Sequence, residues 1–287
     1  MSKQIRVGLI GTGGYQQGAT IPKLLELPQA EIAALCDDAA SQIASCKKRY
    51  PVLAQVPEFS DYRRMIAEAG LDAVAISTPH TLHYRQIMDS LGAGLHVLCD
   101  KPMVCSVKHA KAVCDKVKKT RRVFVLSYQR HTLPPFIYMR EQVQNGAIGK
   151  VQYVTAFQSQ NWLNATRGKW RQSMKLSGGG QLNDSGSHLV DAILWVVGQP
   201  VVEVSAWCDN LGTEVDINSA VKMKFANGAL GTMAVVGDAQ VFWEDINIIG
   251  SKGTLIYRNN TVTHITGVGA PKLTVEFPPQ ATNPVRN

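Results

Sequence analysis

The residues with the clearest chemical potential stand between positions 178 and 195, where three glycines precede an acid and an imidazole. Asp184, His188 and Asp191 follow one another at intervals of four and three positions, and Trp195 comes four positions later. Side chains at these intervals share one face of a helix. Most residues around them are apolar, so the pattern predicts a buried helix that carries ionisable groups.

Buried ionisable groups need partners or a function, because a carboxylate or an imidazole buried alone is costly. Two interpretations stay open for this helix. Asp184 caps it and His188 is a hydrogen-bonded core histidine, or both residues take part in proton transfer. The glycines at 178, 179 and 180 favour the functional interpretation, since glycine lets the backbone come close to a neighbour at a cost in chain entropy.

A lysine stands at a second position of interest, in the sequence Asp100-Lys101-Pro102 directly after the apolar run His96 to Cys99. Proline fixes the turn and favours an extended backbone at Lys101. A cation held at the end of a strand is suited to stabilise a developing negative charge or to exchange a proton. The plainer interpretation is an exposed surface lysine.

The start of the chain reads as a strand, Ile5 to Ile10, followed by Gly11-Thr12-Gly13-Gly14-Tyr15-Gln16 and a helical pattern. In a dinucleotide-binding fold the first glycine makes the tight turn and the second lets a pyrophosphate reach the backbone. The helix N-terminus then supplies oriented N–H donors. Gln16 takes the place of the usual third glycine or alanine, which leaves the packing of this helix on its strand open.

An acid follows the next strand, Glu31 to Cys36, at Asp37. This is about where a dinucleotide-binding fold places the carboxylate that binds the adenosine ribose hydroxyls. A carboxylate there would repel a 2′-phosphate, so we expect NAD and consider NADP a weaker candidate. A strand, turn and helix without any ligand is the alternative.

Two further strands end at the same edge of the expected sheet. The run Ala73 to Ser77 stops before Thr78-Pro79-His80, and His96 to Cys99 stops before Asp100. Ligands of doubly wound sheets bind beyond the carboxyl ends of the strands. The residues expected to contact the cofactor are therefore Gly11, Gly13, Gly14, Tyr15, Asp37, Thr78, Pro79, His80, Asp100 and Lys101.

Strands and helices alternate up to about residue 126, which predicts an α/β domain with a parallel sheet covered on both faces, a Rossmann domain over residues 1–126. Residues 127–287 are expected to form an α+β domain with an open, largely antiparallel sheet, for substrate binding and oligomerisation. The expected strands are 5–10, 31–36, 73–77, 96–99, 123–126 and 151–160, and the expected helices are 21–27, 39–49, 82–91, 107–118 and one begun by Pro134 and closed by Gly146.

Composition narrows the class of protein. The 287 residues are 45% hydrophobic, enough for two cores, but no apolar run approaches the roughly 20 residues of a membrane helix. The six cysteines show no metal-binding spacing, so we expect no metal and reduced thiols in a cytoplasmic protein. The net charge of +8 is densest between Lys116 and Arg122, where a solvated helix end explains it without nucleic acid. Residues 1–6 do not resemble an export signal.

Together the glycine loop, Asp37, Thr78-Pro79, Asp100-Lys101-Pro102 and the stretch from Asp184 to Asp191 resemble the Gfo/Idh/MocA oxidoreductases, which include inositol dehydrogenases and glucose–fructose oxidoreductase. The resemblance runs from the N-terminus to about residue 198. It implies a Rossmann domain, a second domain whose open sheet serves oligomerisation as a homodimer or homotetramer, and a bound NAD or NADP. It also implies that Lys101, Asp184 and His188 are catalytic.

The chain departs from the family pattern at three places. Asp100 replaces a glutamate, and His80 replaces an asparagine, which puts a titratable ring near the expected nicotinamide. Relatives commonly continue into a further helix where this sequence stops, after Asn283 to Asn287.

The expected activity is hydride transfer between a nicotinamide cofactor and a sugar, polyol or related carbinol. His188 would be the general base, Lys101 would stabilise charge on the substrate oxygen, and Asp184 would orient His188. Trp162, Trp170 and Arg171 either line the substrate pocket or serve packing. Two alternatives stay open: an NAD-dependent glycosidase that works by transient oxidation, and a non-catalytic regulator that senses the dinucleotide.

Overall fold

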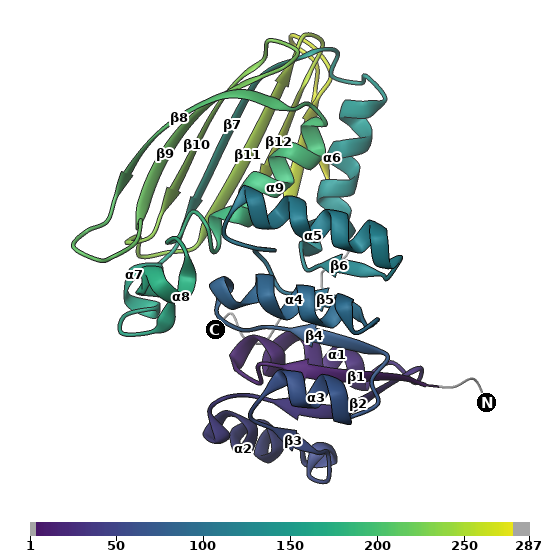
Figure 1. Cartoon of the computed structure of the whole chain (residues 1–287). Helices are drawn as coiled ribbons and strands as arrows, with labels where there is room; N and C mark the ends of the chain where they lie inside the picture. Colours follow the sequence, from purple (N-terminus) through teal and green to yellow (C-terminus); the bar gives the residue numbers. More distant parts are fainter. Residues whose placement is uncertain (1–3, 278–287) are drawn as a thin grey trace. The chain divides into compact units, whose positions relative to one another are not determined.

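The computed structural model describes residues 4–277, which divide into two compact units (Figure 1). The first ends at Ser127 and the second begins at Tyr128. The first unit contains a six-stranded sheet in the order β3-β2-β1-β4-β5-β6, and all its strand pairs are parallel. The strands are β1 (Ile5–Ile10), β2 (Ala30–Cys36), β3 (Glu58–Phe59), β4 (Ala73–Ile76), β5 (His96–Cys99) and β6 (Phe124–Leu126).

Helices cover both faces of this sheet, because its central strands are nearly continuous apolar runs that need burial on both sides. One apolar cluster holds Leu9, Ile21 and Ile43, and a second holds Ile76 and Ile87. The predicted doubly wound parallel sheet is therefore confirmed. Its helices are α1 (Ile21–Leu25), α2 (Ala40–Arg49), α3 (Tyr62–Glu68), α4 (His83–Gly92) and α5 (Val107–Thr120), with short turns η1 (Gln16–Thr20), η2 (Pro51–Leu53) and η3 (His80–Leu82).

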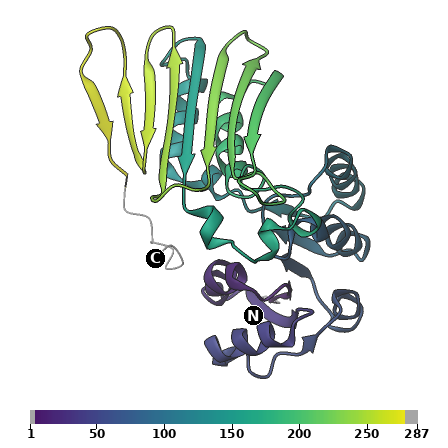
Figure 2. The same ribbon diagram turned by 90° about the vertical axis from the view of Figure 1, so that its left-hand side faces the viewer.

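The second unit is built on an eight-stranded sheet in the order β14-β13-β12-β11-β7-β10-β9-β8. Figure 2 shows the strands of this sheet side by side. The β7–β10 pair is parallel and the other pairs are antiparallel. The predicted open, largely antiparallel sheet is thus confirmed. Its strands are β7 (Val151–Ser159), β8 (Val201–Asp209), β9 (Asn218–Phe225), β10 (Leu230–Val236), β11 (Trp243–Gly250), β12 (Thr254–Arg258), β13 (Thr261–Ile265) and β14 (Lys272–Val275).

Two helices, α6 (Pro134–Gln144) and α9 (Gly186–Val197), pack on one face of this sheet through a core that includes Phe136 and Ile193. The opposite face carries exposed apolar side chains such as Leu230 and Ile249. Between β7 and α9 the chain forms three short helical pieces. These are α7 (Trp162–Ala165), η5 (Trp170–Gln172) and α8 (Met174–Ser177), and a further turn, η4 (Gln129–Thr132), precedes α6.

The apolar periodicity and the turn residues of the sequence predicted most of the helices and strands that the structure contains. A turn at Asn259 and Asn260 joins β12 to β13 with positive φ at both residues, the conformation that asparagine tolerates best after glycine. The short strand β3 and helix α3 were not predicted, because two residues and a polar seven-residue helix carry little periodicity.

Within residues 4–277 we find no helix with the length and apolar character needed to cross a membrane. The stretch from Asn283 to Asn287 lies outside the described residues.

Candidate functional site

The glycine-rich turn after β1 has the geometry that a bound dinucleotide requires. Gly11 has a φ of 83°, and a Cβ built on it would lie 2.3 Å from the carbonyl oxygen of Ser77, so only glycine fits. A Cβ built on Gly13 would meet no protein atom within 4 Å. The protein's own packing therefore does not require glycine at position 13, whereas a ligand that approaches the backbone would.

Gln16 explains how the helix after this turn packs without the usual small residue. Its side chain is buried, and its Nε2 donates a hydrogen bond to the carbonyl oxygen of Ala75 at 2.9 Å. The backbone of this segment is π-helical from Gln16 to Thr20. The wider turn and the bond to β4 together accommodate the larger side chain.

Asp37 is half-buried at the end of β2 and connects three backbone segments. Its Oδ2 accepts a hydrogen bond from the Thr12 N–H at 2.8 Å, and its Oδ1 accepts one from the Ala39 N–H at 3.0 Å. The carboxylate therefore holds the glycine-rich turn against the start of α2. Its expected contact with the ribose hydroxyls stays a prediction.

The turns after β4 and β5 are linked by His83, a residue that sequence reasoning missed. The imidazole is fully buried, with Nδ1 2.8 Å from the carbonyl oxygen of Pro102 and Nε2 3.0 Å from that of Thr78. Burial lowers the pKa of this imidazole, and the two carbonyl contacts and Asp100 oppose that shift. Its partners are 5 and 19 positions away, so no local pattern indicates the link.

The predicted cofactor residues of β5 lie in the same region of the first unit. Asp100 and Lys101 are buried, and an Oδ1 of Asp100 accepts a hydrogen bond from the Lys101 N–H at 2.8 Å. The Lys101–Pro102 peptide is cis. Burial, together with the charge of Asp100, raises the pKa of Tyr15 in the glycine-rich turn to about 12.

One prediction about the second unit was wrong: Asp184 is not in the first turn of the buried helix. Helix α9 begins at Gly186, and Asp184 belongs to the turn before it. The cause is Asp216, whose carboxylate accepts hydrogen bonds from the backbone N–H groups of Gly180 at 2.7 Å and Leu182 at 2.8 Å. A distant side chain thus holds the chain in a turn where local periodicity indicates helix.

The close backbone approach expected of the three glycines is present at Gly180. A Cβ there would lie 1.9 Å from the carbonyl oxygen of Asp216. Gly178 ends α8 in the left-handed conformation, with a φ of 68°. These two glycines therefore shape the turn that carries Asp184.

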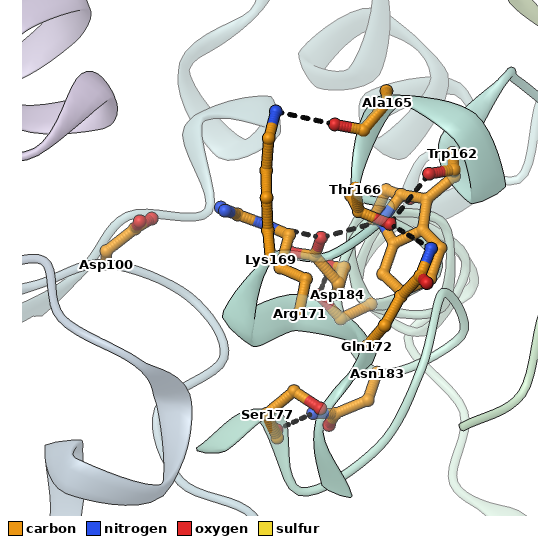
Figure 3. Close-up of polar contacts among 12 residues, drawn as sticks. Asp100, Trp162, Ala165, Thr166, Lys169, Arg171, Gln172, Ser177, Asn183 and Asp184 are labelled. Carbon is orange, nitrogen blue, oxygen red and sulfur yellow. Dashed lines mark hydrogen bonds and ion pairs between the residues drawn. The ribbon is translucent and has the colours of Figure 1, made fainter. Parts of the chain in front are cut away.

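Asp184 binds two side chains of the preceding segment, as Figure 3 shows. Its Oδ2 accepts hydrogen bonds from Trp162 Nε1 at 2.9 Å and from Arg171 Nε at 3.0 Å, and both Asp184 and Trp162 are buried. A carboxylate paired with a guanidinium and an indole N–H is stabilised in its charged form. Trp162 and Arg171, suggested earlier as pocket or packing residues, are thus bound to a predicted catalytic acid.

The segment that contributes these partners is also braced internally. Gln172 Nε2 donates hydrogen bonds to the carbonyl oxygen of Leu163 at 2.6 Å and to Thr166 Oγ1 at 2.9 Å. The dashed lines of Figure 3 include the second of these bonds. Trp162 packs with Val215 in a small apolar cluster of its own.

His188 lies in the first turn of α9 with an aromatic neighbour. The ring of Tyr128 meets the His188 ring edge to face, with centroids 5.6 Å apart and planes at 83°. Such a contact fixes the plane of the imidazole. Tyr128 was not among the predicted site residues, since it lies 60 positions upstream.

The other predicted members of this helix face hold η4. His131 Nε2 lies 2.9 Å from Asp191 Oδ2, and the His131 ring stacks on Trp195 with centroids 4.3 Å apart. Burial raises the pKa of Asp191, and the charge and hydrogen bond of His131 oppose the shift. Asp191 and Trp195 therefore have a structural partner in η4, which leaves His188 as the chemical candidate on α9 and Asp184 as the candidate in the turn before it.

The structure thus brings together the predicted cofactor residues within the first unit, and Asp184 with the N-terminus of α9 within the second. Lys101 belongs to the first unit and His188 to the second. The predicted convergence of these two side chains on one substrate oxygen stays a prediction.

A six-stranded parallel sheet in this order, with a glycine-rich turn after β1 and an acid after β2, defines a Rossmann dinucleotide-binding domain. Residues 5–128 match the family described as "Oxidoreductase family, NAD-binding Rossmann fold", and residues 136–256 match the GFO/IDH/MocA C-terminal domain. The chain belongs to the Gfo/Idh/MocA oxidoreductases. The predicted family and NAD-binding domain are confirmed.

Among characterised relatives, D-glucoside 3-dehydrogenase of Escherichia coli is 28% identical over 202 residues, which are 70% of this chain and 56% of that protein. Levoglucosan dehydrogenase of Pseudarthrobacter phenanthrenivorans is 25% identical over 226 residues, 69% of this chain and 58% of that protein. The matches therefore span a little over half of the length of these relatives.

Solved structures share the fold at lower identity. The WlbA dehydrogenase from Bordetella pertussis, in complex with NADH and UDP-GlcNAcA, has a TM-score of 0.84 at 24% identity and covers 94% of this chain and 79% of that one. An oxidoreductase domain protein from Kribbella flavida has a TM-score of 0.84 at 24% identity, covering 95% and 80%. At this identity the likeness establishes the fold.

Proposed function

We propose that this protein is an NAD-dependent dehydrogenase that oxidises a CH–OH group of a sugar, a polyol or a related carbinol, reversibly. The observation that carries the proposal is the presence of two complementary half-sites in one chain. The first unit has a glycine turn left open at Gly13 and braced by Asp37. The second has His188 at the start of a buried helix, four positions after a carboxylate bound by Arg171.

The glycine-rich turn and the strand ends of the first unit would hold the NAD. Gly13 and Gly14 expose backbone at the N-terminus of a helix, where a diphosphate is stabilised, and the buried Gly11 makes the tight turn before them. Asp37 would accept hydrogen bonds from the ribose hydroxyls, which favours NAD over NADP. The nicotinamide end would lie by the turns after β4 and β5, at Tyr15, Thr78, Pro79, His80, Asp100 and Lys101.

The chemistry needs a base for the hydroxyl proton and a donor to the same oxygen. His188 takes the proton as the carbonyl forms, and Lys101 donates a hydrogen bond to the oxygen and stabilises its partial negative charge. Bound NAD supplies the acceptor for the hydride that leaves the substrate carbon with the electron pair of the broken C–H bond. Asp184, whose Oδ2 accepts a hydrogen bond from Arg171, would favour the protonated state of His188 once the proton has moved.

The proposal includes localisation and oligomeric state. We infer a cytoplasmic homodimer or homotetramer with no nucleic-acid partner. The uncovered face of the eight-stranded sheet, with Phe157, Leu230 and Ile249 exposed, supports self-association, because an apolar sheet face favours burial against a copy of itself.

A panel of sugars, polyols and glycosides tests the function, with NAD and NADP in parallel and the reduced cofactor followed by absorbance. We expect reduced cofactor in amounts equal to the oxidised product, and faster with NAD. Release of an aglycone without net reduced cofactor would instead indicate a glycosidase that works by transient oxidation. Tight NAD binding without turnover of any panel member would indicate a dinucleotide sensor and contradict the proposal.

A further inference from the structure

Arg171 is positioned as a ligand-binding group rather than only as the partner of an acid. Its Nε donates to the buried Asp184 at 3.0 Å, and its guanidinium lies over the Trp170 ring, 4.3 Å from the centroid. These two contacts fix both the position and the plane of the guanidinium. They engage one of its five N–H donors and one of its faces.

The remaining donors form an open end. In the part of the chain that the structure describes, neither Nη1 nor Nη2 of Arg171 has a hydrogen-bond partner, and Figure 3 shows them pointing away from Asp184. The side chain is 31% exposed. Two parallel N–H groups at the end of a fixed guanidinium match a carboxylate or a phosphate, which presents two oxygens in one plane.

The charge of the surrounding segment agrees with an anionic ligand. Residues 161–183 contain four basic residues and no aspartate or glutamate, and the first acid that follows is Asp184 itself. Positive charge raises the local concentration of anions, while Glu214 and Asp216 bond to the backbone of the same segment at Met174 and Gly180. The basic residues of the segment are Arg167, Lys169, Arg171 and Lys175.

We propose that Arg171 is an anion-binding residue of the active site and holds two oxygens of a bound ligand through Nη1 and Nη2. The inference rests on the proposed function, which places Asp184 beside the reacting groups. Two ligands carry the required chemistry: the carboxylate of an acidic sugar, and the diphosphate of the cofactor. Both would be held by the same bidentate pair of charge-assisted hydrogen bonds.

Two variants and one control separate these sources. Arg171→Gln removes the charge, and Arg171→Lys keeps the charge but loses the planar pair of donors. Arg167→Gln is the matched control, since Arg167 is exposed in the same segment and bonds to Asn164 at 2.9 Å. Circular dichroism and thermal unfolding confirm that each variant is folded.

The first measurement is NAD affinity by calorimetry, which needs no turnover. The second is binding of D-glucuronate and of D-glucose to the NAD-saturated protein, a pair that differs in one carboxylate. The third is the KM of each sugar wherever turnover is found. Losing a charge-assisted pair costs roughly ten- to hundredfold in affinity.

If the ligand is an acidic sugar, Arg171→Gln and Arg171→Lys should each weaken the binding of glucuronate roughly ten- to hundredfold relative to the binding of glucose. The affinity for NAD should stay unchanged. If the ligand is the cofactor, both variants weaken NAD binding instead. The proposal would be overturned if wild type, both variants and the control had the same NAD affinity and the same ratio of glucuronate affinity to glucose affinity. Absence of turnover with every sugar would count against the dehydrogenase, while the NAD measurement would still decide the role of Arg171.

Discussion

The backbone N–H of Thr12 donates a hydrogen bond to the carboxylate of Asp37 at 2.8 Å, so the acid after the second strand is attached directly to the glycine-rich turn. One side chain therefore influences both the shape of the turn and the charge that a bound nucleotide meets. This coupling has a measurable consequence for cofactor choice.

We expect Asp37→Ala to reduce the preference for NAD over NADP. The substitution removes a negative charge that would repel a 2′-phosphate, and it also loosens the turn at Thr12, so NAD affinity falls by roughly tenfold while NADP gains relative to it. The check is KM and Kd for both cofactors. Asp38→Ala is the control, because Asp38 is its exposed neighbour. An NAD-to-NADP ratio that stays at the wild-type value would contradict the assignment.

Substitutions at two glycines of the same turn should affect different properties: Gly11→Ala the stability of the fold, and Gly13→Ala the affinity for NAD. Gly11→Ala forces a Cβ to within 2.3 Å of a carbonyl oxygen at a positive φ, so we expect a loss of at least about 1 to 2 kcal/mol in unfolding free energy. The Cβ that Gly13→Ala adds meets no protein atom within 4 Å. The free energy of unfolding of this variant should therefore lie within roughly 0.5 kcal/mol of the wild-type value. Its NAD affinity should nevertheless drop by roughly tenfold, because the methyl group stands where the diphosphate approaches. Chemical denaturation and calorimetry measure both quantities. Unimpaired NAD binding in Gly13→Ala would place the diphosphate elsewhere.

Lys101→Ala and His188→Ala should each lower turnover about a hundredfold or more while leaving NAD affinity largely intact. The first removes a donor to the substrate oxygen and the second removes the base. Lys118→Ala, in the last turn of α5, is the matched control. Single-turnover rates of NADH formation give the comparison. Wild-type rates in either Lys101→Ala or His188→Ala would remove that residue from the mechanism.

The buried imidazole of His83 should make stability depend on pH. Because burial lowers its pKa below 6.5, the unfolded chain takes up a proton near pH 6.5 that the folded chain takes up only at lower pH. The free energy of unfolding should therefore fall as the pH drops below 6.5, by up to about 1.4 kcal/mol per pH unit for one such group. The groups that act on this imidazole are Cys99, Asp100 and Lys101 and the carbonyls of Thr78 and Pro102.

Urea unfolding of wild type, His83→Asn, His264→Asn and the double variant tests this expectation between about pH 5 and 8, a range that spans the ordinary histidine pKa. Burial lowers the pKa of His264 in the same direction, so each variant should flatten part of the slope and the double variant most of it. His83→Asn should also destabilise the fold at neutral pH, since it breaks the link between the turns after β4 and β5. A slope unaltered in the double variant would show that other groups control the acid side.

Much of the first unit was predictable because its information is local. The strand limits at Ile5–Ile10 and His96–Cys99 were predicted as observed, since apolar runs bounded by glycine or charge leave few alternatives. Gly11 and Asp37 could be placed because their roles depend on distance from a strand end. The same reasoning placed α6 behind its prolines.

What the sequence could not predict depends on partners far along the chain. The position of Asp184 outside α9 follows from Asp216, which binds the preceding turn from 34 and 36 positions away. The link made by His83 and the ring contact between Tyr128 and His188 have the same character. Pattern and spacing describe which residues share an element, whereas these contacts require the packed fold.

The stretch between β7 and α9 is braced from within by the hydrogen bonds of Gln172 to Leu163 and Thr166, and from outside by Asp216, which bonds to the Gly180 N–H. Its side chains reach Asp184, yet its own bracing does not draw on the sheet core, which is filled by α6 and α9. Substitutions on the exposed side of this stretch, such as at Arg167, should therefore leave the core between the sheet and helices α6 and α9 intact.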